Sequence, residues 1–400
     1  MFEGKKIILG VTGGIAAYKA CDIVSRLLKT GAEVKVIMTS SACEFVSPVT
    51  FRALSNNPVA SSVFDEPNNW DINHISLARW ADAFLIAPAT ANIIGKIANG
   101  IADDMLSTTV MATKAPVVVA PAMNTSMYEN PILQKNIKYL SGLGYSFCGV
   151  RQSRLACGDV GKGALLENED ILEVLSGALC SDKGLKGKNV LVTAGPTQEA
   201  IDPVRFITNH SSGKMGYAVA RAAIRHGANV TLVSGKTNQR PPYGAKLVLI
   251  ESADSMFDAC VEHGKNADII IKAAAVADYK PKLAAANKLK KGDSEKTIEL
   301  TANRDILKTL GENKGHRVLV GFCMETENLL ANAVEKLKNK NADMIVANTL
   351  NDKDAGFGVD TNTITILRKN REPYSFPNMS KDKAAENIIL AAIEILGELT

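Results

Sequence analysis

The sequence predicts an α/β protein made of two Rossmann-like, three-layer domains with parallel sheets. Two stretches, 84–92 and 117–128, each begin with an uncharged run of apolar residues, which is typical of parallel strands buried on both faces. Such runs alternate with helical periodicity, which favours βαβ units. The alternation breaks at 176–188, a stretch rich in Gly, Ser and Lys that is typical of a linker. The sequence therefore predicts a first domain at 1–180, a linker at 181–187 and a second domain at 188–400.

The composition limits the classes of function. The chain has 400 residues, of which 46% are hydrophobic, and a formal net charge of only +4. This balance gives no reason to expect nucleic acid or a membrane as a partner, and no apolar run is long enough to span a bilayer. The seven cysteines are odd in number and form no CxxC motif, so they indicate neither a disulfide framework nor a zinc cluster. With no visible signal peptide, we expect a reduced, cytoplasmic protein.

The first βαβ unit occupies residues 6–38. The pattern predicts a strand at 6–12, a helix at 15–29 that counts Tyr18 among its apolar positions, and a strand at 32–38. The turn between the first strand and the helix contains Gly13 and Gly14. Backbone N–H groups at the start of that helix form a natural phosphate site.

This turn lacks the dinucleotide fingerprint GxGxxG. If Gly10 were its first glycine, the second would fall at position 12, where the chain has Thr12. A mononucleotide such as a flavin phosphate fits better. Thr39 and Ser41, which follow the second strand, can add hydroxyl groups to the same phosphate.

The two apolar stretches end in the same way, with Ala-Pro-Ala followed by polar residues. Proline removes a backbone donor, so we expect each strand to end there. Ligands of open parallel sheets gather beyond the carboxyl ends of the strands, which would bring Thr90, Asn92 and Asn124 to one rim. The alternative is a pair of core strands that end in turn prolines, but the repetition favours a site.

Three further features of the first half bear on chemistry. His74 precedes the strand at 84–92, although a lone histidine is usually structural. Asp103 and Asp104 are a carboxylate pair or, as we expect, part of a helix cap. Cys157 lies among glycines and basic residues, which is typical of a reactive or proton-donating thiol on a mobile flap.

The motifs of the first half form a recognisable set: Thr12-Gly-Gly-Ile-Ala-Ala-Tyr-Lys, His74-Ile-Ser-Leu-Ala-Arg-Trp-Ala-Asp, Ala87-Pro-Ala-Thr-Ala-Asn, Pro121-Ala-Met-Asn-Thr-Ser-Met and Ala156-Cys-Gly-Asp. This set resembles the flavin-dependent cysteine decarboxylases, whose domain has a flavodoxin-like fold. The resemblance implies that His74 is the acid or base of oxidation and decarboxylation, that Asn124 holds the substrate and that Cys157 is the final proton donor. It also implies an FMN site at a trimer interface, formed by Gly13, Gly14, Ile15, Thr39, Ser41, Thr90, Asn92 and Ala122.

The second half restarts the α/β pattern. We expect strands at 189–194, 229–233, 268–275, 318–322 and 344–348, helices at 215–226 and 383–399, and a polar loop at 201–214. Ser212-Gly-Lys is not a Walker A motif, because Thr208 and Met215 occupy positions that the motif reserves for other residues. The loop can still bind a phosphate at the helix start. The basic cluster that begins at Lys288 is either a solvated surface or part of a site.

Four motifs stand out in this half: Arg205-Phe-Ile-Thr-Asn-His-Ser-Ser-Gly-Lys-Met-Gly, Ala273-Ala-Ala-Val-Ala-Asp, Lys288-Leu-Lys-Lys and Gly321-Phe. They resemble the phosphopantothenate–cysteine ligases, which use CTP and Mg2+, and the two halves together resemble the bifunctional enzymes of coenzyme A biosynthesis nearly end to end. The resemblance implies that Lys288 supports acyl transfer and that Arg205 and Asn209 hold the acyl-cytidylate. It implies a CTP site formed by Ala273, Ala274, Ala275, Asp278, Lys288, Asp305, Ile306, Phe322, Lys336 and Lys340. The ligands of Mg2+ stay unassigned.

The resemblance also implies an assembly. Trimers of the decarboxylase half, joined by dimers of the ligase half, would give a homo-oligomer, a dodecamer, with small molecules as the other partners. The chain departs from the family pattern at Tyr128, Ala164 and Arg304, where the family usually has Trp, Arg and Pro. These departures concern the Asn124 segment, the flap and the nucleotide site.

Other classes of function fit less well. Relatives of the decarboxylase half act as regulatory subunits of phosphatases, but those tend to carry long acidic tails, and none is present here. A flavoprotein prenyltransferase of similar fold would need neither Cys157 nor residues 188–400. The missing fingerprint disfavours an NAD-dependent dehydrogenase.

Overall fold

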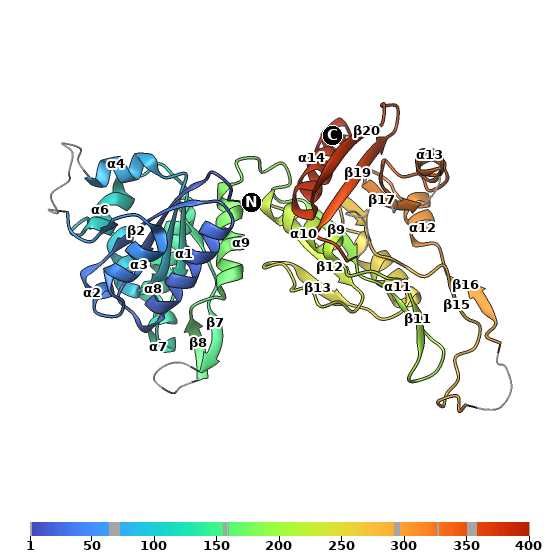
Figure 1. The fold of residues 1–400 in the computed structure, drawn as a ribbon, viewed down its shortest axis with the longest axis horizontal. Coiled ribbons are helices and arrows are strands. Elements are labelled where there is room, and N and C mark those ends of the chain that lie inside the picture. Colours follow the sequence, from blue (N-terminus) through green and yellow to red (C-terminus); the bar gives the residue numbers. More distant parts are fainter. Residues whose placement is uncertain are drawn as a thin grey trace. The chain divides into compact units, whose positions relative to one another are not determined.

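The structure is a computed structural model that describes residues 2–63, 73–154, 158, 160–291, 297–325, 328–349 and 358–399. The chain divides into two compact units, Met1–Ser181 and Asp182–Thr400 (Figure 1). No helix in these described ranges combines the length and the apolar character needed to cross a membrane. Each unit is a sheet covered by helices, as the sequence predicts.

The first unit is built on a sheet with the strand order β3-β2-β1-β4-β5-β6. All strand pairings in this sheet are parallel. With the two-residue edge strand β3 set aside, the order is that of flavodoxin-like sheets, and it reverses between β1 and β4. The strands are Lys6–Val11 (β1), Glu33–Met38 (β2), Val59–Ala60 (β3), Ala83–Ala89 (β4), Val117–Pro121 (β5) and Ser146–Phe147 (β6).

Helices cover both faces of this sheet, and a hairpin of β7 (Arg151–Arg154) and β8 (Val160–Ala164) extends beside it. Leu77, Ile93, Leu106 and Leu133 pack on one face from α4, α5, α6 and α8. The helical elements are Ile15–Lys19 (η1, a 3-10 turn), Ala20–Lys29 (α1), Ser40–Cys43 (α2), Pro48–Ser55 (α3), Asn73–Trp80 (α4), Ala91–Ala98 (α5), Met105–Ala112 (α6), Thr125–Tyr128 (α7), Pro131–Gly142 (α8) and Asn168–Leu179 (α9).

Two details of the first unit differ from the sequence prediction. The helix predicted at 15–29 is divided into η1 and α1, and Tyr18 in η1 is 61% exposed instead of contributing to the core. Its spacing fits a continuous helix, but the 3-10 turn rotates it away from the face that α1 buries. The strand β5 includes Pro121, which pairs with Ala89 at an irregular position in the ladder. Asp104 caps α6 in a capping box with Ser107, as expected.

The second unit has a larger sheet with the order β13-β12-β9-β14-β17-β18-β19-β20. Its first six strands are parallel in the Rossmann order, which reverses between β9 and β14. The sheet strands are Asn189–Ala194 (β9), Asn229–Ser234 (β12), Lys246–Leu249 (β13), Ile269–Lys272 (β14), Val318–Glu325 (β17), Met344–Thr349 (β18), Thr361–Arg368 (β19) and Tyr374–Ser380 (β20).

Helices cover both faces here too, and each face has its own hydrophobic core. Tyr217 and Ile388 belong to the core under α10 and α14. Met256 and Leu337 belong to the core under α11, α12 and α13. The helices are Lys214–Arg225 (α10), Ala253–Gly264 (α11), Ile306–Glu312 (α12), Leu329–Asn339 (α13) and Lys381–Leu399 (α14). Two short antiparallel pairs complete the unit: β10 (Gln198–Ala200) with β11 (Phe206–Thr208), and β15 (Tyr279–Pro281) with β16 (Leu300–Ala302).

The second sheet also differs from the prediction in two respects. Strand β19 pairs antiparallel with β18, and β20 pairs antiparallel with β19. Burial alternates along the first six residues of β19, which is the pattern of a strand with one face less buried than the other. The strand predicted at 268–275 ends at Lys272, so the three alanines that follow lie in the loop beyond it. The predicted parallel α/β class is confirmed for both units.

Candidate active sites

The first candidate site lies at the carboxyl ends of β1, β4 and β5, where the strand order reverses. The hydroxyl of Thr12 donates to the Pro88 carbonyl at 2.7 Å and accepts from the Thr90 N–H at 3.1 Å. The Ala122 N–H donates to the Ala89 carbonyl at 3.0 Å. These hydrogen bonds connect the ends of the three strands, because residues that follow β1 and β5 pair with backbone groups at the end of β4.

A cleft of about 460 Å3 opens above these strand ends. Six residues that the resemblance assigns to the flavin or the substrate line it: Gly13, Gly14, Ile15, Thr90, Ala122 and Asn124. A Cβ atom at Gly13 would lie 2.3 Å from the Cβ of Ser41, so only glycine permits this approach of the two loops. Thr39 caps the short helix α2 in the same loop. Asn92 lines a neighbouring groove instead, together with Lys96 and Asn130.

The β7–β8 hairpin docks onto the loop that follows β5. The Met123 N–H donates to the Gly163 carbonyl at 2.9 Å. A Cβ atom at Gly163 would lie 2.3 Å from the Met123 carbonyl oxygen, and one at Gly161 would lie 2.3 Å from the Thr125 hydroxyl. The glycines of the predicted flap thus allow close packing of the hairpin base against the cleft. Cys157 itself lies outside the described residues.

Asn124 and His74 occupy different positions relative to this cleft. The Asn124 side-chain oxygen accepts from the Ser126 N–H at 2.9 Å and caps α7, which fixes the side chain at the edge of the cleft. His74 is half-buried in the first turn of α4 and is not among the residues that line the cleft in this single chain. The sequence did not single out Tyr18, Ser153 or Met127 as cleft residues, although all three line it.

The second candidate site lies at the equivalent edge of the second sheet, beyond β9 and β14. The Thr193 hydroxyl accepts from the Ala274 N–H at 3.1 Å, and the Thr197 hydroxyl accepts from the Ala277 N–H at 3.0 Å. The Ala275 N–H donates to the Gly195 carbonyl at 3.0 Å. The loop after β14 is therefore fixed to the loop after β9.

A cavity of about 420 Å3 next to this loop collects most of the predicted nucleotide residues. They are Ala274, Ala275, Asp278, Asp305, Ile306, Phe322, Lys336 and Lys340. Ala273 lines an adjoining cavity instead, and Lys288 lines neither of the two. The sequence did not identify Lys272, Asn303 or Arg304 as part of this lining, although Arg304 was noted as a departure from the family pattern.

The charges on this second cavity are partly paired. The Lys340 ammonium lies 2.6 Å from Asp305, whose other carboxylate oxygen accepts from the Lys308 N–H at the start of α12. Burial raises the pKa of Asp305, but these hydrogen bonds outweigh it and hold the pKa below its usual range. Arg304 forms ion pairs with Asp254 and Asp258, so its guanidinium is held at the rim of the cavity.

The polar loop after β9 carries the residues predicted to contact the acyl intermediate. Asn209 donates from its side-chain nitrogen to the Val276 carbonyl at 3.2 Å, which places it beside the alanine loop. Arg205 pairs with the buried Asp202 and donates to the Leu289 carbonyl at 2.8 Å. The Leu289 N–H donates back to the Asp202 carboxylate at 3.1 Å. This network anchors the backbone of Leu289, the residue that directly follows Lys288. The sequence did not predict this role for Asp202.

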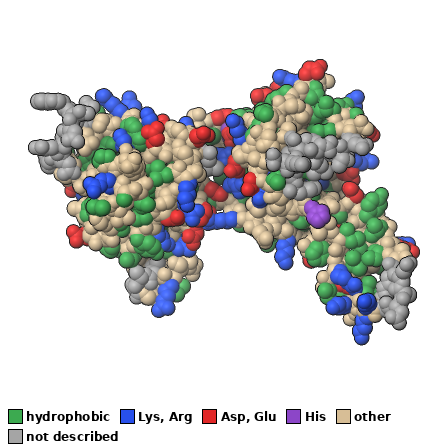
Figure 2. All heavy atoms as spheres, viewed as in Figure 1, with side chains coloured by type: hydrophobic (Ala, Val, Ile, Leu, Met, Phe, Trp, Pro, Cys, Tyr) green, Lys and Arg blue, Asp and Glu red, His purple; other side chains and the backbone are tan. Residues whose placement is uncertain are grey.

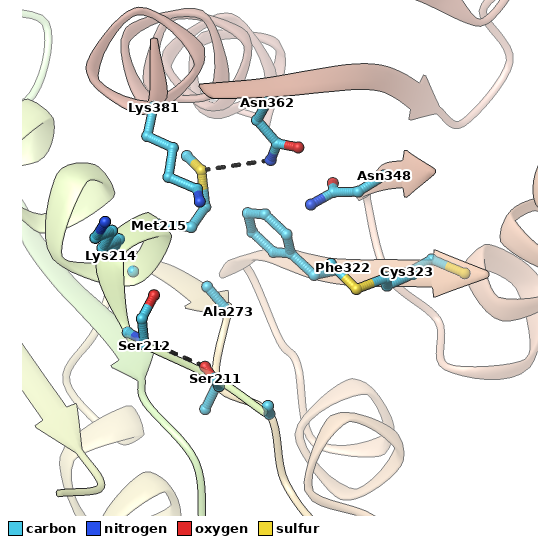
Figure 3. A pocket seen from close by; sticks show the side chains of 15 residues that line it. Ser211, Ser212, Lys214, Met215, Ala273, Phe322, Cys323, Asn348, Asn362 and Lys381 are labelled. Atoms are coloured by element: carbon cyan, nitrogen blue, oxygen red, sulfur yellow. Dashed lines mark hydrogen bonds between the residues drawn. The ribbon is translucent and has the colours of Figure 1, made fainter. Parts of the chain in front are cut away.

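The adjoining cavity, of about 150 Å3, lies at the start of α10 (Figure 3). Ser211, Ser212 and Lys214 approach it from one side, and Asn348 and Asn362 from the other, with Phe322 between them (Figure 3). The side-chain oxygens of both asparagines are buried and have no hydrogen-bond partner among the described residues. Sequence reasoning did not find these asparagines, because nothing in β18 or β19 marks them as more than strand residues.

The folds and sites define a class of protein: a flavoprotein domain fused to a second Rossmann-like domain with a charged cavity. The match to known families agrees. Residues 1–179 match the family described as "Flavoprotein", and residues 185–395 match the "DNA/pantothenate metabolism flavoprotein C-terminal domain".

Curated relatives extend this match over nearly the whole chain. The chain is similar to the coenzyme A biosynthesis bifunctional protein CoaBC of Bacillus subtilis, with 50% identity over 95% of both chains. It is also similar to the CoaBC protein of Escherichia coli, with 43% identity over 91% of both chains. A crystal structure of the C-terminal domain of a CoaBC protein is 45% identical and covers 54% of this chain and 100% of its own, with a TM-score of 0.47.

The chain belongs to the family of coenzyme A biosynthesis bifunctional proteins. It is a bifunctional enzyme, with a decarboxylase in its flavoprotein domain and a ligase in its second domain. The resemblance seen in the sequence is thereby confirmed. The roles of the individual residues remain predictions.

Proposed function

We propose that the second domain joins 4′-phosphopantothenate to cysteine with CTP and Mg2+, and that the first domain decarboxylates the product with FMN to give 4′-phosphopantetheine. One observation carries this proposal. Residues that the resemblance assigns to two different ligands converge on two separate cavities, each at the switch point of its own sheet.

The ligase reaction transfers a nucleotidyl group and then an acyl group. The phosphopantothenate carboxylate attacks the α-phosphorus of CTP, pyrophosphate leaves, and the cysteine amine then displaces CMP from the acyl-cytidylate. Negative charge gathers on phosphate oxygens, so lysine and arginine side chains are the groups that this reaction needs. Lys288 would supply such a charge from the loop that Asp202 anchors, and Asn209 would hold the acyl-cytidylate beside the alanine loop.

Arg205 fits two roles in this reaction. Its Nε and one terminal nitrogen are engaged by Asp202 and Leu289, so it orders the Lys288 segment. Its side chain is still 50% exposed, and its other terminal nitrogen has no partner among the described residues. That nitrogen is available to the acyl-cytidylate.

The decarboxylase reaction needs an electron sink, because direct loss of CO2 from a cysteine carboxylate would leave an unstabilised carbanion. When bound, FMN would take up a hydride from the CH2–SH group and return it after CO2 has left. His74 would remove and return protons during oxidation and decarboxylation, Asn124 would hold the substrate, and Cys157 would give the last proton to the enethiolate.

The cleft residues suit a flavin mononucleotide. Exposed Ile15, Tyr18 and Met127 offer apolar surface at the cleft for a planar ring system. The exposed Ser41 hydroxyl at the start of α2 and the N–H groups near Gly13 are donors for a phosphate. Since the family places the flavin between subunits, we propose that His74 acts on the cleft of a neighbouring subunit.

We also propose that the chain forms a homo-oligomer in which ligase dimers join decarboxylase trimers into a dodecamer. Apolar side chains are 42% to 87% exposed on the strands and loops around β11 and β15–β16, where hydrophobic side chains gather on the surface (Figure 2), as is typical of an interface. They are Val204, Phe206, Tyr279, Leu283, Ile298 and Leu300. Light scattering on the purified protein tests this assembly, and a monomer would contradict it.

We propose a cytoplasmic location, since the odd number of cysteines and the lack of a CxxC motif give no indication of a disulfide framework.

The proposed function is tested on the purified protein. The visible spectrum is recorded, and CO2 and pyrophosphate are followed after adding 4′-phosphopantothenate, cysteine, Mg2+ and either CTP or ATP. We expect bound FMN and both products with CTP alone. Both products with ATP would overturn the nucleotide assignment, and a colourless protein that makes neither product would overturn the proposal.

A further inference from the structure

Two lysines on the nucleotide cavity of the second domain have no partner among the residues that the structure describes. Lys272 is the last residue of β14, and Lys336 lies in the last turns of α13; both line the cavity of about 420 Å3. Neither ammonium group forms a hydrogen bond or ion pair with any residue that the structure describes. The other cations at this cavity, Lys340 and Arg304, are paired with aspartates.

The position of Lys272 is unfavourable for a charge that serves only structure. It follows Ile269, Ile270 and Ile271, which are buried in the centre of the sheet, and it is the only charged residue of its strand. Burial lowers the pKa of Lys272, and the nearby charge of Lys336 lowers it further. Cys260 on α11, Asp305 at the start of α12 and Asp278 in the loop after β14 act in the opposite direction without overcoming this effect.

Two unpaired like charges on one partly desolvated cavity repel each other, and an anion between them would relieve that repulsion. Phosphate is the anion that this chemistry favours, because an ammonium group is a compact point charge that can donate to several phosphate oxygens. A carboxylate is less suitable, since Asp305 already supplies one in the cavity without pairing with either lysine.

We propose that Lys272 and Lys336 form a phosphate-binding pair for a substrate of the ligase domain. This inference rests on the proposed function for the source of the phosphate, which is either the phosphate chain of the nucleoside triphosphate or the phosphate ester of the acyl substrate. Lys272 is then a ligand-binding residue that neither the sequence motifs nor the resemblance assigns.

A proton balance follows from this arrangement. A bound phosphate favours the charged form of Lys272 and raises its pKa, so binding takes up protons wherever Lys272 is partly neutral in the free protein. The affinity is highest below the pKa of the free protein and falls as the pH rises through the pKa of the complex. The same argument predicts that removing the charge stabilises the empty domain.

The test uses the full-length protein with its flavin bound and isothermal titration calorimetry of four probes: CTP, inorganic pyrophosphate, 4′-phosphopantothenate and cytidine. In Lys272→Met we expect about a 10- to 100-fold weaker affinity for at least one phosphate-bearing probe, the effect of losing a charge-assisted hydrogen bond. Cytidine should bind within about twofold of the wild type. Loss with CTP and pyrophosphate assigns the phosphate chain, and loss with 4′-phosphopantothenate alone assigns the ester.

Lys336→Met should give the same pattern, and Lys338→Met is the matched control. Lys338 lies on the same helix as Lys336 and does not line the cavity. Because Lys338→Met removes the same charge at a different place, the affinity for each probe should stay within about twofold of the wild type. Titrations in two buffers of different ionisation enthalpy should show proton uptake in the wild type and in Lys338→Met, but less in Lys272→Met. The flavin spectrum, which reports on the other domain, and the thermal midpoint confirm that each variant is folded.

Two results would overturn the inference. One is wild-type affinity of Lys272→Met for every phosphate-bearing probe. The other is a lower thermal midpoint of the empty Lys272→Met protein, which would indicate a structural lysine. A wild-type protein that binds pyrophosphate through Lys272 but neither CTP nor 4′-phosphopantothenate would keep the phosphate pair and contradict the proposed function instead.

Discussion

The two candidate sites occupy the same position in two similar sheets but are lined by different chemistry. Each lies beyond the first strand of its domain and the neighbour across the switch point, β1 with β4 and β9 with β14. The cleft of the first domain presents glycines, apolar side chains, the hydroxyl and amide groups of Thr90 and Asn124, and three cationic side chains, those of Lys19, Arg151 and Arg154. The cavity of the second presents four cations and two aspartates, and burial and neighbouring charges lower the pKa of Lys272 while hydrogen bonds lower that of Asp305.

This difference shows how one architecture serves two kinds of reaction. A bound flavin would carry the electrons itself, so the first domain needs close packing, a substrate clamp and a few proton donors. Nucleotidyl transfer moves no electrons between partners and creates charge on phosphates, so the second domain needs fixed cations. Variants that impair one half-reaction and leave the other intact test whether the two sites are separate in function.

Replacing His74 with Asn should abolish decarboxylation and leave the ligase unchanged. Loss of a general acid or base lowers a rate by about 10²- to 10⁴-fold. CO2 release from supplied 4′-phosphopantothenoylcysteine should fall in that range, while pyrophosphate release stays within about twofold of the wild type. Comparable CO2 release from the variant would remove His74 from the mechanism.

Lys288→Gln should give the reverse pattern. Loss of one cation aimed at developing charge lowers the rate by about 10²- to 10³-fold. Pyrophosphate release should fall accordingly, and decarboxylation of the supplied intermediate should be unchanged. Lys282→Gln is the matched control on the same loop, because its ammonium pairs only with the exposed Glu299 among the described residues. An equal loss in both variants would show a general effect of charge.

The Asp202 network should matter less than Lys288 itself. Asp202→Asn removes the charge that orders Arg205. It also weakens the hydrogen bond that the residue 202 side chain accepts from the Leu289 N–H. We expect roughly a tenfold lower ligase rate, of the order of one charge-assisted hydrogen bond, with an intact flavin spectrum. If the rate were unchanged, the network would not position the Lys288 segment during catalysis.

The stability of the second domain should depend on Glu386 at low pH. Hydrogen bonds from His226 and Arg225 lower the pKa of Glu386 to about 2. Because the folded-state pKa lies below the unfolded-state value of about 4.3, this stabilisation is present above that value and is lost as the pH falls toward 2. Glu386→Gln should lower the free energy of unfolding by about 1–2 kcal/mol at pH 7, after allowance for solvent screening, and flatten its dependence on pH.

Denaturant unfolding of both proteins between pH 2 and pH 7, followed by circular dichroism, measures this effect. Parallel curves for the variant and the wild type across that range would contradict it.

The smallest effect should come from the aspartate pair of the first domain. Asp104 caps α6, so Asp104→Ala should cost about 1 kcal/mol of stability. Asp103 pairs with Lys96 at the surface, and Asp103→Asn should change stability by less than about 0.5 kcal/mol. Thermal denaturation measures both changes, and CO2 release should stay within about twofold. A large loss of activity in either variant would revive their interpretation as catalytic carboxylates.

Much of the fold could be predicted because buried parallel strands have a distinct pattern. Ala83–Ala89 and Val117–Pro121 are fully buried, as their uncharged runs indicate. Strands β19 and β20 were not predicted, since β19 alternates buried residues with partly buried threonines, most residues of β20 are exposed, and the polar positions of both resemble a loop. Tyr18 was misplaced because spacing alone does not distinguish a 3-10 turn from the first turn of an α-helix.

The site residues also divide into those that the sequence predicted and those that it missed. The alanines after β14 were predicted because the motif is contiguous and specific. Lys272 was missed because the sequence placed it inside a strand at 268–275, and only the folded sheet shows that the strand ends at this lysine and that the lysine lines a cavity. Asn362 was missed because it comes within contact of Met215, 147 residues away, through the antiparallel edge of the sheet.

The most direct test of two separate active sites is complementation in solution. His74→Asn and Lys288→Gln are each supplied with 4′-phosphopantothenate, cysteine, CTP and Mg2+, first alone and then as an equal mixture. We expect almost no CO2 from either variant alone. The mixture should release CO2, because His74→Asn makes the intermediate that Lys288→Gln consumes. A mixture as inactive as its components, although each variant keeps its other half-reaction, would contradict independent sites linked by a free intermediate.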